Sequence, residues 1–387
     1  MEQVRIGIIG LGNMGSSHCL HIHIENKVPG MVLGAVCDTS AERREWSQKT
    51  LPGIPVFDHY EEMYNSGLID AVLIAVPHYD HPELAIKGFD SGLHILVEKP
   101  AGVYTKQVLE MNAAAEKSDK LFGIMYNQRT NPVYQKVKDL VESGELGELK
   151  RVVWIVTNWY RPQAYHDSGS WRSTWAGEGG GTLINQNPHN LDLLQWMLGK
   201  PTKLRSFCSF GKFYNIEVED DVTAYMEFAN GASGVYITST GEAPGTNRLE
   251  VSGDMGKIVV ENNIITFHRN RISEREHNQT NTKAFATPEN WVCEVPAAKD
   301  GGEQHIGIMK NFTNALLRGD SLLAPGEEGI HGLLISNAIH YSTWTDTMVD
   351  LDNFDHDHFY ELLQERIQYS TVKKKVVQQI ADVAGTH

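Results

Sequence analysis

Short apolar runs alternate with helix-like segments over the first part of the chain. The runs are rich in β-branched residues and are apolar on both faces, which is typical of parallel strands covered by helices on both sides. The pattern therefore predicts a doubly wound α/β domain over residues 1–125. The expected strands are residues 4–9, 32–37, 71–76, 94–97 and 122–125.

The hydrophobic pattern changes after residue 125. A helix-like segment at residues 132–142 leads into longer alternating runs with few helices between them. Such runs predict an α+β domain, residues 126–387, with a large, mostly antiparallel sheet that is open on one face. An open face needs a cover, so we expect a homodimer or homotetramer. The expected strands are residues 149–157, 204–210, 222–228, 233–238 and 249–252.

The rest of the second domain contains one polar segment and three segments with helical periodicity. Residues 269–290 are polar and are expected to form a long loop. Helical periodicity returns at residues 307–317, 329–345 and 356–369.

A glycine motif directly follows the first expected strand and opens a helix-like segment. In this setting the first glycine of G-x-G-x-x-G permits a tight turn, the second lets the backbone approach a pyrophosphate, and the third lets helix and strand pack closely. A glycine-rich turn of no special meaning is the alternative, but the context favours an amino-terminal Rossmann fold that binds a dinucleotide. The residues expected to contact it are Gly10, Gly12, Asn13, Met14 and Gly15.

Asp38 ends the second expected strand. An acid about 20 residues beyond the glycine motif accepts hydrogen bonds from the adenosine ribose and repels a 2′-phosphate. Asp38 therefore favours NAD over NADP, while Arg43 and Arg44 leave use of both cofactors open. The alternative role for Asp38 is to cap the following helix.

Two further segments carry candidate chemistry. Glu98-Lys99-Pro100 follows the strand at residues 94–97, at the carboxyl edge where ligands of such sheets bind, so the Lys99 ammonium could bond a substrate hydroxyl. The glycine-rich stretch at residues 179–189 ends in His189, at the expected start of a helix. A histidine can take a proton near neutral pH. The alternatives are a solvated lysine and a structural histidine.

Aromatic and arginine side chains are concentrated between residues 158 and 175. Aromatic faces and arginine forks suit the apolar faces and hydroxyls of a sugar ring. Packing at a domain or subunit interface is the alternative. The candidates for the substrate pocket are Tyr160, Arg161, Tyr165, Trp171, Arg172 and Trp175.

Composition excludes several classes of function. The chain has 34 Lys and Arg against 49 Asp and Glu, a net charge of −15, and its one basic cluster is the lysine run at residues 373–375. Nucleic acid and membranes are therefore not expected partners. The 4 cysteines form no C-x-x-C pair, and no secretion signal is seen, which favours the reducing cytoplasm. The stretch at residues 355–358 is expected to be a polar helix start, and no metal site is expected.

Taken together, these elements resemble the Gfo/Idh/MocA family, named for glucose-fructose oxidoreductase, inositol 2-dehydrogenase and MocA. Its pattern is GxGxxG, then E-K-P, then a glycine-rich D-x-x-x-H stretch, and the order and separations agree over nearly the whole chain. The resemblance implies that Lys99 and His189 are catalytic. The usual aspartate is Asn185 here, whose amide can hold a substrate hydroxyl but cannot bear a charge.

The resemblance also implies contacts with the cofactor outside the glycine motif. Residues 75–81 match a stretch beside the nicotinamide ribose, and residues 126–129 match a Y-x-Q-R segment that would place Arg129 at the rim of the active site. The added candidates for the cofactor are Pro77, His78, His81, Glu98, Lys99 and Arg129.

These observations predict an NAD-dependent dehydrogenase that oxidises a secondary hydroxyl of a sugar, glycoside or cyclitol. In this hypothesis His189 removes the hydroxyl proton and Lys99 stabilises the alkoxide. The alternative is that Lys99 is the base. One alternative is a redox-neutral lyase, glycosidase or epimerase that retains NAD. The other is a non-catalytic NAD(H) sensor.

Overall fold

The first domain is built on a parallel sheet of 6 strands in the order β3-β2-β1-β4-β5-β6. This order and all of the pairings in the sheet are those of a Rossmann fold. The computed structural model describes residues 2–371, so the lysine run at residues 373–375 lies outside the described residues. The strands are β1 Val4–Ile9, β2 Met31–Cys37, β3 Val56–Phe57, β4 Ala71–Ile74, β5 His94–Val97 and β6 Phe122–Ile124.

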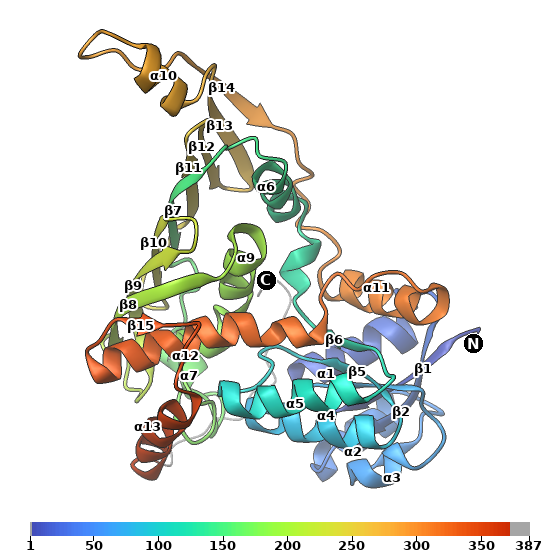
Figure 1. Ribbon diagram of the computed structural model, residues 1–387. Helices are drawn as coiled ribbons and strands as arrows, with labels where there is room; N and C mark the ends of the chain where they lie inside the picture. The colour runs from blue at the N-terminus through green and yellow to red at the C-terminus, as the bar shows by residue number, and fades with distance from the viewer. Residues whose placement is uncertain (1, 372–387) are drawn as a thin grey trace.

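Helices cover both faces of this sheet (Figure 1). The strands are apolar on both sides for that reason, and Ile6, Leu73 and Ile95 are fully buried. The strand β3 has only two residues and was not predicted. The helical elements are α1 Asn13–Cys19, η1 Leu20–Ile24, α2 Ala41–Thr50, α3 Tyr60–Tyr64, η2 His78–Asp80, α4 His81–Asp90, α5 Thr105–Lys117 and η3 Asn127–Thr130.

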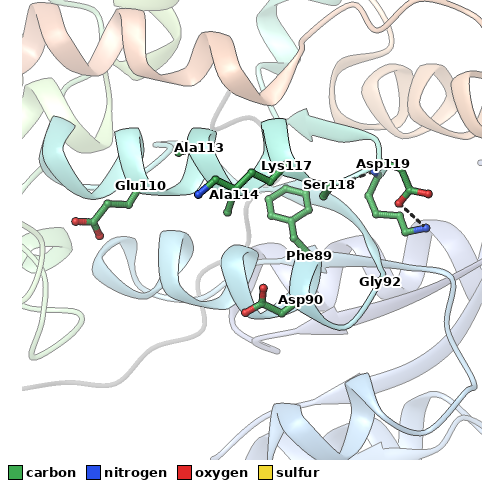
Figure 2. Close-up of a pocket in the computed structure, with 10 residues that line it drawn as sticks. Phe89, Asp90, Gly92, Glu110, Ala113, Ala114, Lys117, Ser118 and Asp119 are labelled. Atoms are coloured by element: carbon green, nitrogen blue, oxygen red, sulfur yellow. Dashed lines mark hydrogen bonds and ion pairs between the residues drawn. The ribbon is translucent and has the colours of Figure 1, made fainter.

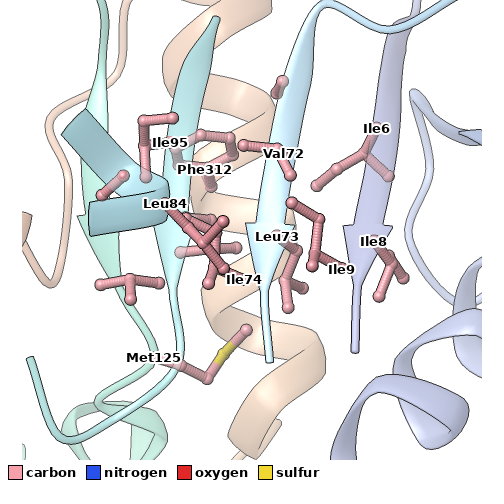
Figure 3. Close-up of a cluster of buried hydrophobic side chains, with 14 of the residues drawn as sticks. Ile6, Ile8, Ile9, Val72, Leu73, Ile74, Leu84, Ile95, Met125 and Phe312 are labelled. Carbon is pink, nitrogen blue, oxygen red and sulfur yellow. The ribbon is translucent and has the colours of Figure 1, made fainter. Parts of the chain in front are cut away.

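The carboxyl-terminal part of the chain returns to complete the core of the first domain. Helix α11, Gln304–Arg318, contributes Ile308, Met309 and Phe312 to the same hydrophobic cluster as the parallel strands. Figure 3 shows Phe312 on the face of the sheet opposite to Leu84 of α4. The division predicted at residue 125 therefore separates the two sheets, but it does not separate the two cores.

The second domain contains a sheet of 9 strands in the order β14-β13-β12-β11-β7-β10-β9-β8-β15. The pairing of β7 with β10 is parallel and the other pairings are antiparallel, which confirms the predicted fold class. The strands are β7 Leu149–Val156, β8 Pro201–Phe210, β9 Glu219–Phe228, β10 Ser233–Ser239, β11 Asn247–Gly253, β12 Gly256–Glu261, β13 Ile264–Asn270, β14 Asn290–Val295 and β15 Val349–Asp350.

Helices cover only one face of this second sheet (Figure 1). Trp154 and Tyr236 point to the covered face and are fully buried, whereas Phe207 and Tyr225 on the other face are 66% and 40% exposed. The long helix α12 packs between the domains and contributes Leu333 to one core and Ile335 to the other. The helices are α6 Pro132–Glu142, α7 Gln163–His166, α8 Thr182–Asn185, α9 Pro188–Leu198, η4 Gly326–Glu328, α12 Gly329–Thr345 and α13 His356–Gln368.

The prediction of a long loop at residues 269–290 is wrong in part. This segment holds the end of β13 and the helix α10, Glu274–Thr280, and it leads into the edge strand β14. Figure 1 shows it projecting from the end of the sheet. Neither α10 nor β14 buries a face completely, so neither leaves a hydrophobic period in the sequence. Within the described residues, no helix is both long enough and apolar enough to cross a membrane.

Candidate active site

The glycine motif forms the turn between β1 and α1. Gly10 has a φ of +87°, and a Cβ atom there would lie 2.4 Å from the carbonyl oxygen of Ala75. A Cβ atom on Gly15 would lie 1.8 Å from the carbonyl oxygen of Gly10, so neither position accepts a side chain. Nothing lies within 4 Å of a Cβ atom built on Gly12. This open space fits the close approach of a pyrophosphate to the start of α1, where Asn13 and Met14 lie.

Asp38 links the end of β2 to the glycine turn. Its carboxylate accepts hydrogen bonds from the backbone N–H groups of Leu11, at 2.6 Å, and Ser40, at 2.7 Å. The side chain that caps α2 is that of Ser40, so the capping alternative for Asp38 is wrong. The carboxylate is held at the carboxyl edge of the sheet, where the ribose of a dinucleotide binds.

The two arginines near Asp38 are engaged within the protein. Arg43 donates to the Leu11 carbonyl and to the Ser16 hydroxyl, each at 2.6 Å. Arg44 donates to the carbonyl oxygens of Asp38, at 2.9 Å, and Thr39, at 2.8 Å. Because these donors are used and a carboxylate lies beside them, the geometry favours NAD over a cofactor with a 2′-phosphate.

Lys99 joins the two domains at the carboxyl edge of β5. Its Nζ donates to the carbonyl oxygen of Asn185 at 3.1 Å. The preceding Glu98 is buried, with its Oε1 2.6 Å from Nε2 of His18. Burial lowers the pKa of Lys99, Glu98 opposes that effect, and Arg172 adds to it. Lys99 is therefore a partly exposed cation that holds its proton less tightly than a lysine in water.

His189 is the second residue of α9, as the sequence predicts, with Pro188 as the first. The His189 side chain is buried, and its ring lies edge-on to that of Tyr126 with the centroids 6.4 Å apart. Upstream, the buried carboxylate of Glu219 accepts the backbone N–H groups of Gly181 and Leu183 at 2.9 Å. Glu219 thus fixes the glycine-rich segment that leads to His189. The catalytic role of His189 stays a prediction.

A buried carboxylate lies directly beside Asn185, the last residue of α8. The Asn185 amide donates to Glu178, and its Oδ1 accepts from the Tyr165 hydroxyl at 3.2 Å. Glu178 also accepts the backbone N–H of Ser173 at 2.6 Å. Burial raises the pKa of Glu178, and the nearby Arg172 opposes that effect. Sequence reasoning missed Glu178, whose one signal is an acid placed immediately before three glycines.

Four of the six aromatic and arginine candidates gather beside Asn185. The guanidinium carbons of Arg161 and Arg172 lie 5.2 and 4.7 Å from the centroid of the Tyr165 ring. Arg172 also donates to the Tyr165 hydroxyl at 2.9 Å and covers the ring of Trp171 at 4.4 Å. All four side chains are partly exposed. The structure therefore brings them together with Lys99, as the pocket hypothesis requires.

The other two candidates differ from this group in their contacts. Trp175 is 6% exposed, and its ring packs against Phe210, His340 and Trp344 within the second domain. The prediction that the Trp175 ring lines a pocket is wrong, because packing inside the domain occupies the ring. Tyr160 is 45% exposed, and its carbonyl oxygen accepts from Arg161 at 3.0 Å.

The stretch from Pro77 to His81 forms the turn after β4. The ring nitrogens of His81 lie 2.7 Å from the carbonyl oxygen of Pro100 and 2.9 Å from that of Val76, so this ring bridges the turns after β4 and β5. The His78 ring contacts that of Trp171, with the centroids 5.7 Å apart. Burial holds the pKa of His78 well below its usual range. Pro77, which precedes η2, and both histidines remain predicted cofactor contacts.

Arg129 lies in the interior instead of at a rim. Its side chain is 1% exposed and donates to both carboxylate oxygens of Asp192, at 2.8 and 2.6 Å. It also donates to Glu328 at 2.6 Å and to the Leu323 carbonyl at 3.1 Å. The prediction for Arg129 is wrong because these acceptors engage the guanidinium inside the protein.

Two other regions do not contribute to the site. Asp355 caps α13 by accepting the N–H of His358, which confirms the polar helix start. Among residues 2–371, no group of three or more histidine, cysteine or acidic side chains is placed to hold a metal ion. The surface hollow between α4 and α5 in Figure 2 is lined by Gly92 and Lys120, which precede β5 and β6. It therefore lies at the amino edge of the parallel sheet, opposite to Lys99.

Comparison with known families covers both domains. Residues 4–126 match the model described as oxidoreductase family, NAD-binding Rossmann fold. Residues 134–259 match the GFO/IDH/MocA C-terminal domain.

Individual proteins show the same relationship. The chain is 30% identical to the scyllo-inositol 2-dehydrogenase (NAD(+)) of Bacillus subtilis, over 67% of this chain and 74% of that protein. It is 29% identical to the inositol 2-dehydrogenase of Corynebacterium glutamicum over 59% of this chain, and the match spans only 65% of that relative. Its fold resembles that of the WlbA dehydrogenase of Bordetella pertussis in complex with NADH and UDP-GlcNAcA, with a TM-score of 0.75 and 25% identity over 91% of this chain and 100% of the other.

Proposed function

The chain belongs to the GFO/IDH/MocA family of oxidoreductases, and from that premise we propose that it is an NAD-dependent dehydrogenase acting on a secondary hydroxyl of a sugar, glycoside or cyclitol. The observation that carries the proposal is the contact of the Lys99 ammonium, from the first domain, with Asn185 of the second, at 3.1 Å. It places Lys99 beside the segment that bears His189. The names of the inositol and scyllo-inositol dehydrogenases among its relatives support this substrate class.

The residues around the glycine turn fit NAD. Gly12 leaves the backbone open to the pyrophosphate, and Asp38 presents a carboxylate to the adenosine ribose. Bound NAD supplies the acceptor for the hydride that leaves the substrate carbon.

The chain itself supplies proton transfer and charge stabilisation. His189 removes the proton of the substrate hydroxyl, and the Lys99 ammonium stabilises the alkoxide that develops. The Asn185 carbonyl orients that ammonium, because it accepts one of its three N–H groups. The second domain holds the remainder of the substrate near Tyr165, Trp171 and Arg172.

A substrate screen tests the proposal. Purified enzyme with NAD is mixed with cyclitols, aldoses, sugar acids and glycosides, and the absorbance of reduced nicotinamide is followed. We expect net reduction with at least one polyhydroxylated substrate, and its loss in Lys99→Ala and His189→Ala. Turnover of a glycoside or epimer without net reduction, by enzyme that co-purifies with NAD, would instead support a redox-neutral reaction.

We also propose that the enzyme is a homodimer or homotetramer assembled through the open face of the large sheet. Val153, Val235 and Tyr225 are adjacent on that face in neighbouring strands, and all are partly or fully exposed. Phe207, 66% exposed, extends this apolar surface. Light scattering should show Phe207→Glu as a smaller particle than the wild type, with Phe285→Glu at an exposed site on the projecting segment as the control. An unchanged mass would contradict this interface.

The cysteines support a cytoplasmic location, which we propose on chemical grounds. Cys19, Cys37, Cys208 and Cys293 are all free. Fractionation of the source cells, with thiol labelling of the isolated enzyme, should find it in the cytoplasm with all four thiols reduced. Recovery from an oxidising compartment would contradict the proposal.

A further inference from the structure

Three cations surround a short chain of contacts at the active site. The Lys99 ammonium contacts the Asn185 carbonyl at 3.1 Å, and the Asn185 side chain accepts from the Tyr165 hydroxyl at 3.2 Å. That hydroxyl accepts from Arg172 at 2.9 Å. Arg161 lies over the same tyrosine ring, 5.2 Å from its centroid. All three cationic side chains remain partly exposed, so a ligand beside Lys99 can reach both arginines.

Among the described residues neither arginine forms an ion pair, although Arg172 is near enough to the buried Glu178 to oppose the rise that burial causes in the pKa of that carboxyl. Within residues 2–371, no carboxylate lies within 4.0 Å of the guanidinium of Arg161 or Arg172, although Arg5 and Arg129 each form such an ion pair. The carboxylates that act on Lys99 are those of Glu98 and Glu178, and both are buried and already hydrogen-bonded within the protein.

Three cations near one another raise the free energy of the protein unless a negatively charged ligand lies between them. Like charges near one another raise the free energy of the charged forms, and the lowered pKa of Lys99 reflects part of that cost. The whole chain carries a net charge of −15, so acids are abundant elsewhere but do not lie against these two arginines. Planar guanidinium groups bind carboxylate and phosphate oxygens through paired hydrogen bonds.

We propose that the physiological substrate carries an oxyanion, a carboxylate or a phosphate, that binds between Arg161 and Arg172 while the hydroxyl to be oxidised lies at Lys99. The inference rests on the proposed function, because it assigns the substrate class of the same site. In this arrangement the two ends of the substrate contact different residues. Lys99 and His189 act at the reacting hydroxyl, whereas the two arginines select the charged end and set its distance from the reacting carbon.

The anion would also act on Lys99 through its charge. A negative group beside Arg172 and Arg161 offsets the repulsion that these arginines exert on the Lys99 ammonium. A neutral substrate leaves that repulsion in place. Charged substrates are therefore expected to gain in binding, and Lys99 is expected to keep its proton to a higher pH when one is bound.

Matched substrates test the proposal in the full-length enzyme with NAD. Gluconate is compared with glucitol, glucuronate with glucose, and glucose 6-phosphate with glucose. The first two pairs test a carboxylate and the third tests a phosphate. We expect kcat/KM to favour one anionic arm over its neutral partner by about 10- to 100-fold, the value of a charge-assisted hydrogen bond. Arg161→Gln and Arg172→Gln should each remove most of that preference, mainly through KM. Arg318→Gln, at an exposed position at the end of α11, is the control and should keep it.

Binding to the enzyme–NADH complex is measured separately by calorimetry. This separates the inference from the proposed function. A binding preference for the anion that Arg172→Gln abolishes would support the inference even if no sugar reduced NAD, and that absence would count against the dehydrogenase alone. Equal binding of charged and neutral partners, or a preference that survives in both arginine variants, would overturn the inference whatever the turnover.

Discussion

Two groups of charged side chains differ in how completely their charges are matched. Around Arg129, the carboxylates of Asp192 and Glu328 and a carbonyl engage the guanidinium, and the side chain is 1% exposed. Around Lys99, neither nearby arginine forms an ion pair within the described residues, and the Lys99 residue is partly exposed. The matched group links η3 to α9 and η4, whereas the group around Lys99 is the one that we propose to bind the charged end of the substrate.

This contrast corrects an interpretation based on motif alone. Arg129 and Lys99 both follow strands of the parallel sheet and both lie in segments that resemble family motifs. Only the contacts in the structure distinguish the two residues. The sequence does not show whether an acid from another part of the chain forms an ion pair with either cation. Asp192 of α9 and Glu328 of η4 are such acids.

The largest expected effect is on stability, from the matched group. Arg129→Ala leaves the buried carboxylate of Asp192 without its partner, so we expect the free energy of unfolding to fall by about 3–5 kcal/mol. Arg5→Ala breaks the more exposed ion pair with Asp70 and should cost about 1 kcal/mol or less. Denaturant titration measures both. Equal losses in the two variants would show that the buried ion pair stabilises the fold no more than the exposed one.

A smaller effect, on catalysis, is expected from changing the Asn185 amide that donates to the Glu178 carboxylate. Asn185→Asp places a second carboxylate against Glu178, which raises the pKa of the pair. Below that raised pKa the pair shares a proton and resembles the wild type. As the pH rises through it, both groups become charged, so kcat/KM should fall by about 10-fold at alkaline pH, the cost of an unsatisfied buried group.

The exchange of the two groups is the control for this prediction. The double variant Glu178→Gln, Asn185→Asp restores one amide and one carboxylate with their positions swapped. It should recover part of the activity and lose the alkaline fall. A double variant as impaired as Asn185→Asp, with the same pH profile, would show that the contact with Glu178 does not govern the effect.

An effect no larger than this is expected on the choice of cofactor. Asp38→Ala removes the carboxylate that would accept the ribose hydroxyls, so NADH binding should weaken by about 10-fold and its advantage over NADPH should narrow. Asp38→Asn keeps an acceptor for the Leu11 N–H and separates loss of charge from loosening of the glycine turn. Fluorescence titration gives both affinities. Unchanged relative affinities in both variants would remove Asp38 from the cofactor site.

The sequence predicts the elements whose periodicity is strong. The strands β1, β2, β4, β5 and β6 and the helices α11, α12 and α13 were predicted within a few residues, because each buries an apolar run or stripe. Among the elements it missed, β3, α10 and β14 bury too little to leave a period. It also missed β12 and β13, although their buried residues do alternate with less buried ones. The return of α11 to the first domain was also missed, since an apolar helix face does not reveal which sheet covers it.

Some residues of the candidate site were also predicted from the sequence, and others were not. Lys99, Asn185, Tyr165 and Arg172 were predicted from motif and composition, and the structure places them together. Trp175 and Arg129 were misplaced because their partners, such as Trp344 and Asp192, lie far away in the sequence. Glu178 was missed for the converse reason: its contacts with Ser173 and Asn185 are local but carry no motif.

We propose that Lys99 acts on the reacting hydroxyl, and that neither cofactor binding nor folding depends on it. The most direct test compares Lys99→Ala with the wild type in reduction of NAD by a substrate from the screen, with NADH affinity and thermal unfolding measured on the same preparations. Removal of one preorganised charge-stabilising donor predicts a loss of at least about 100-fold in kcat. NADH binding and unfolding temperature should stay close to those of the wild type. A variant that reduces NAD at a near-wild-type rate would contradict the account.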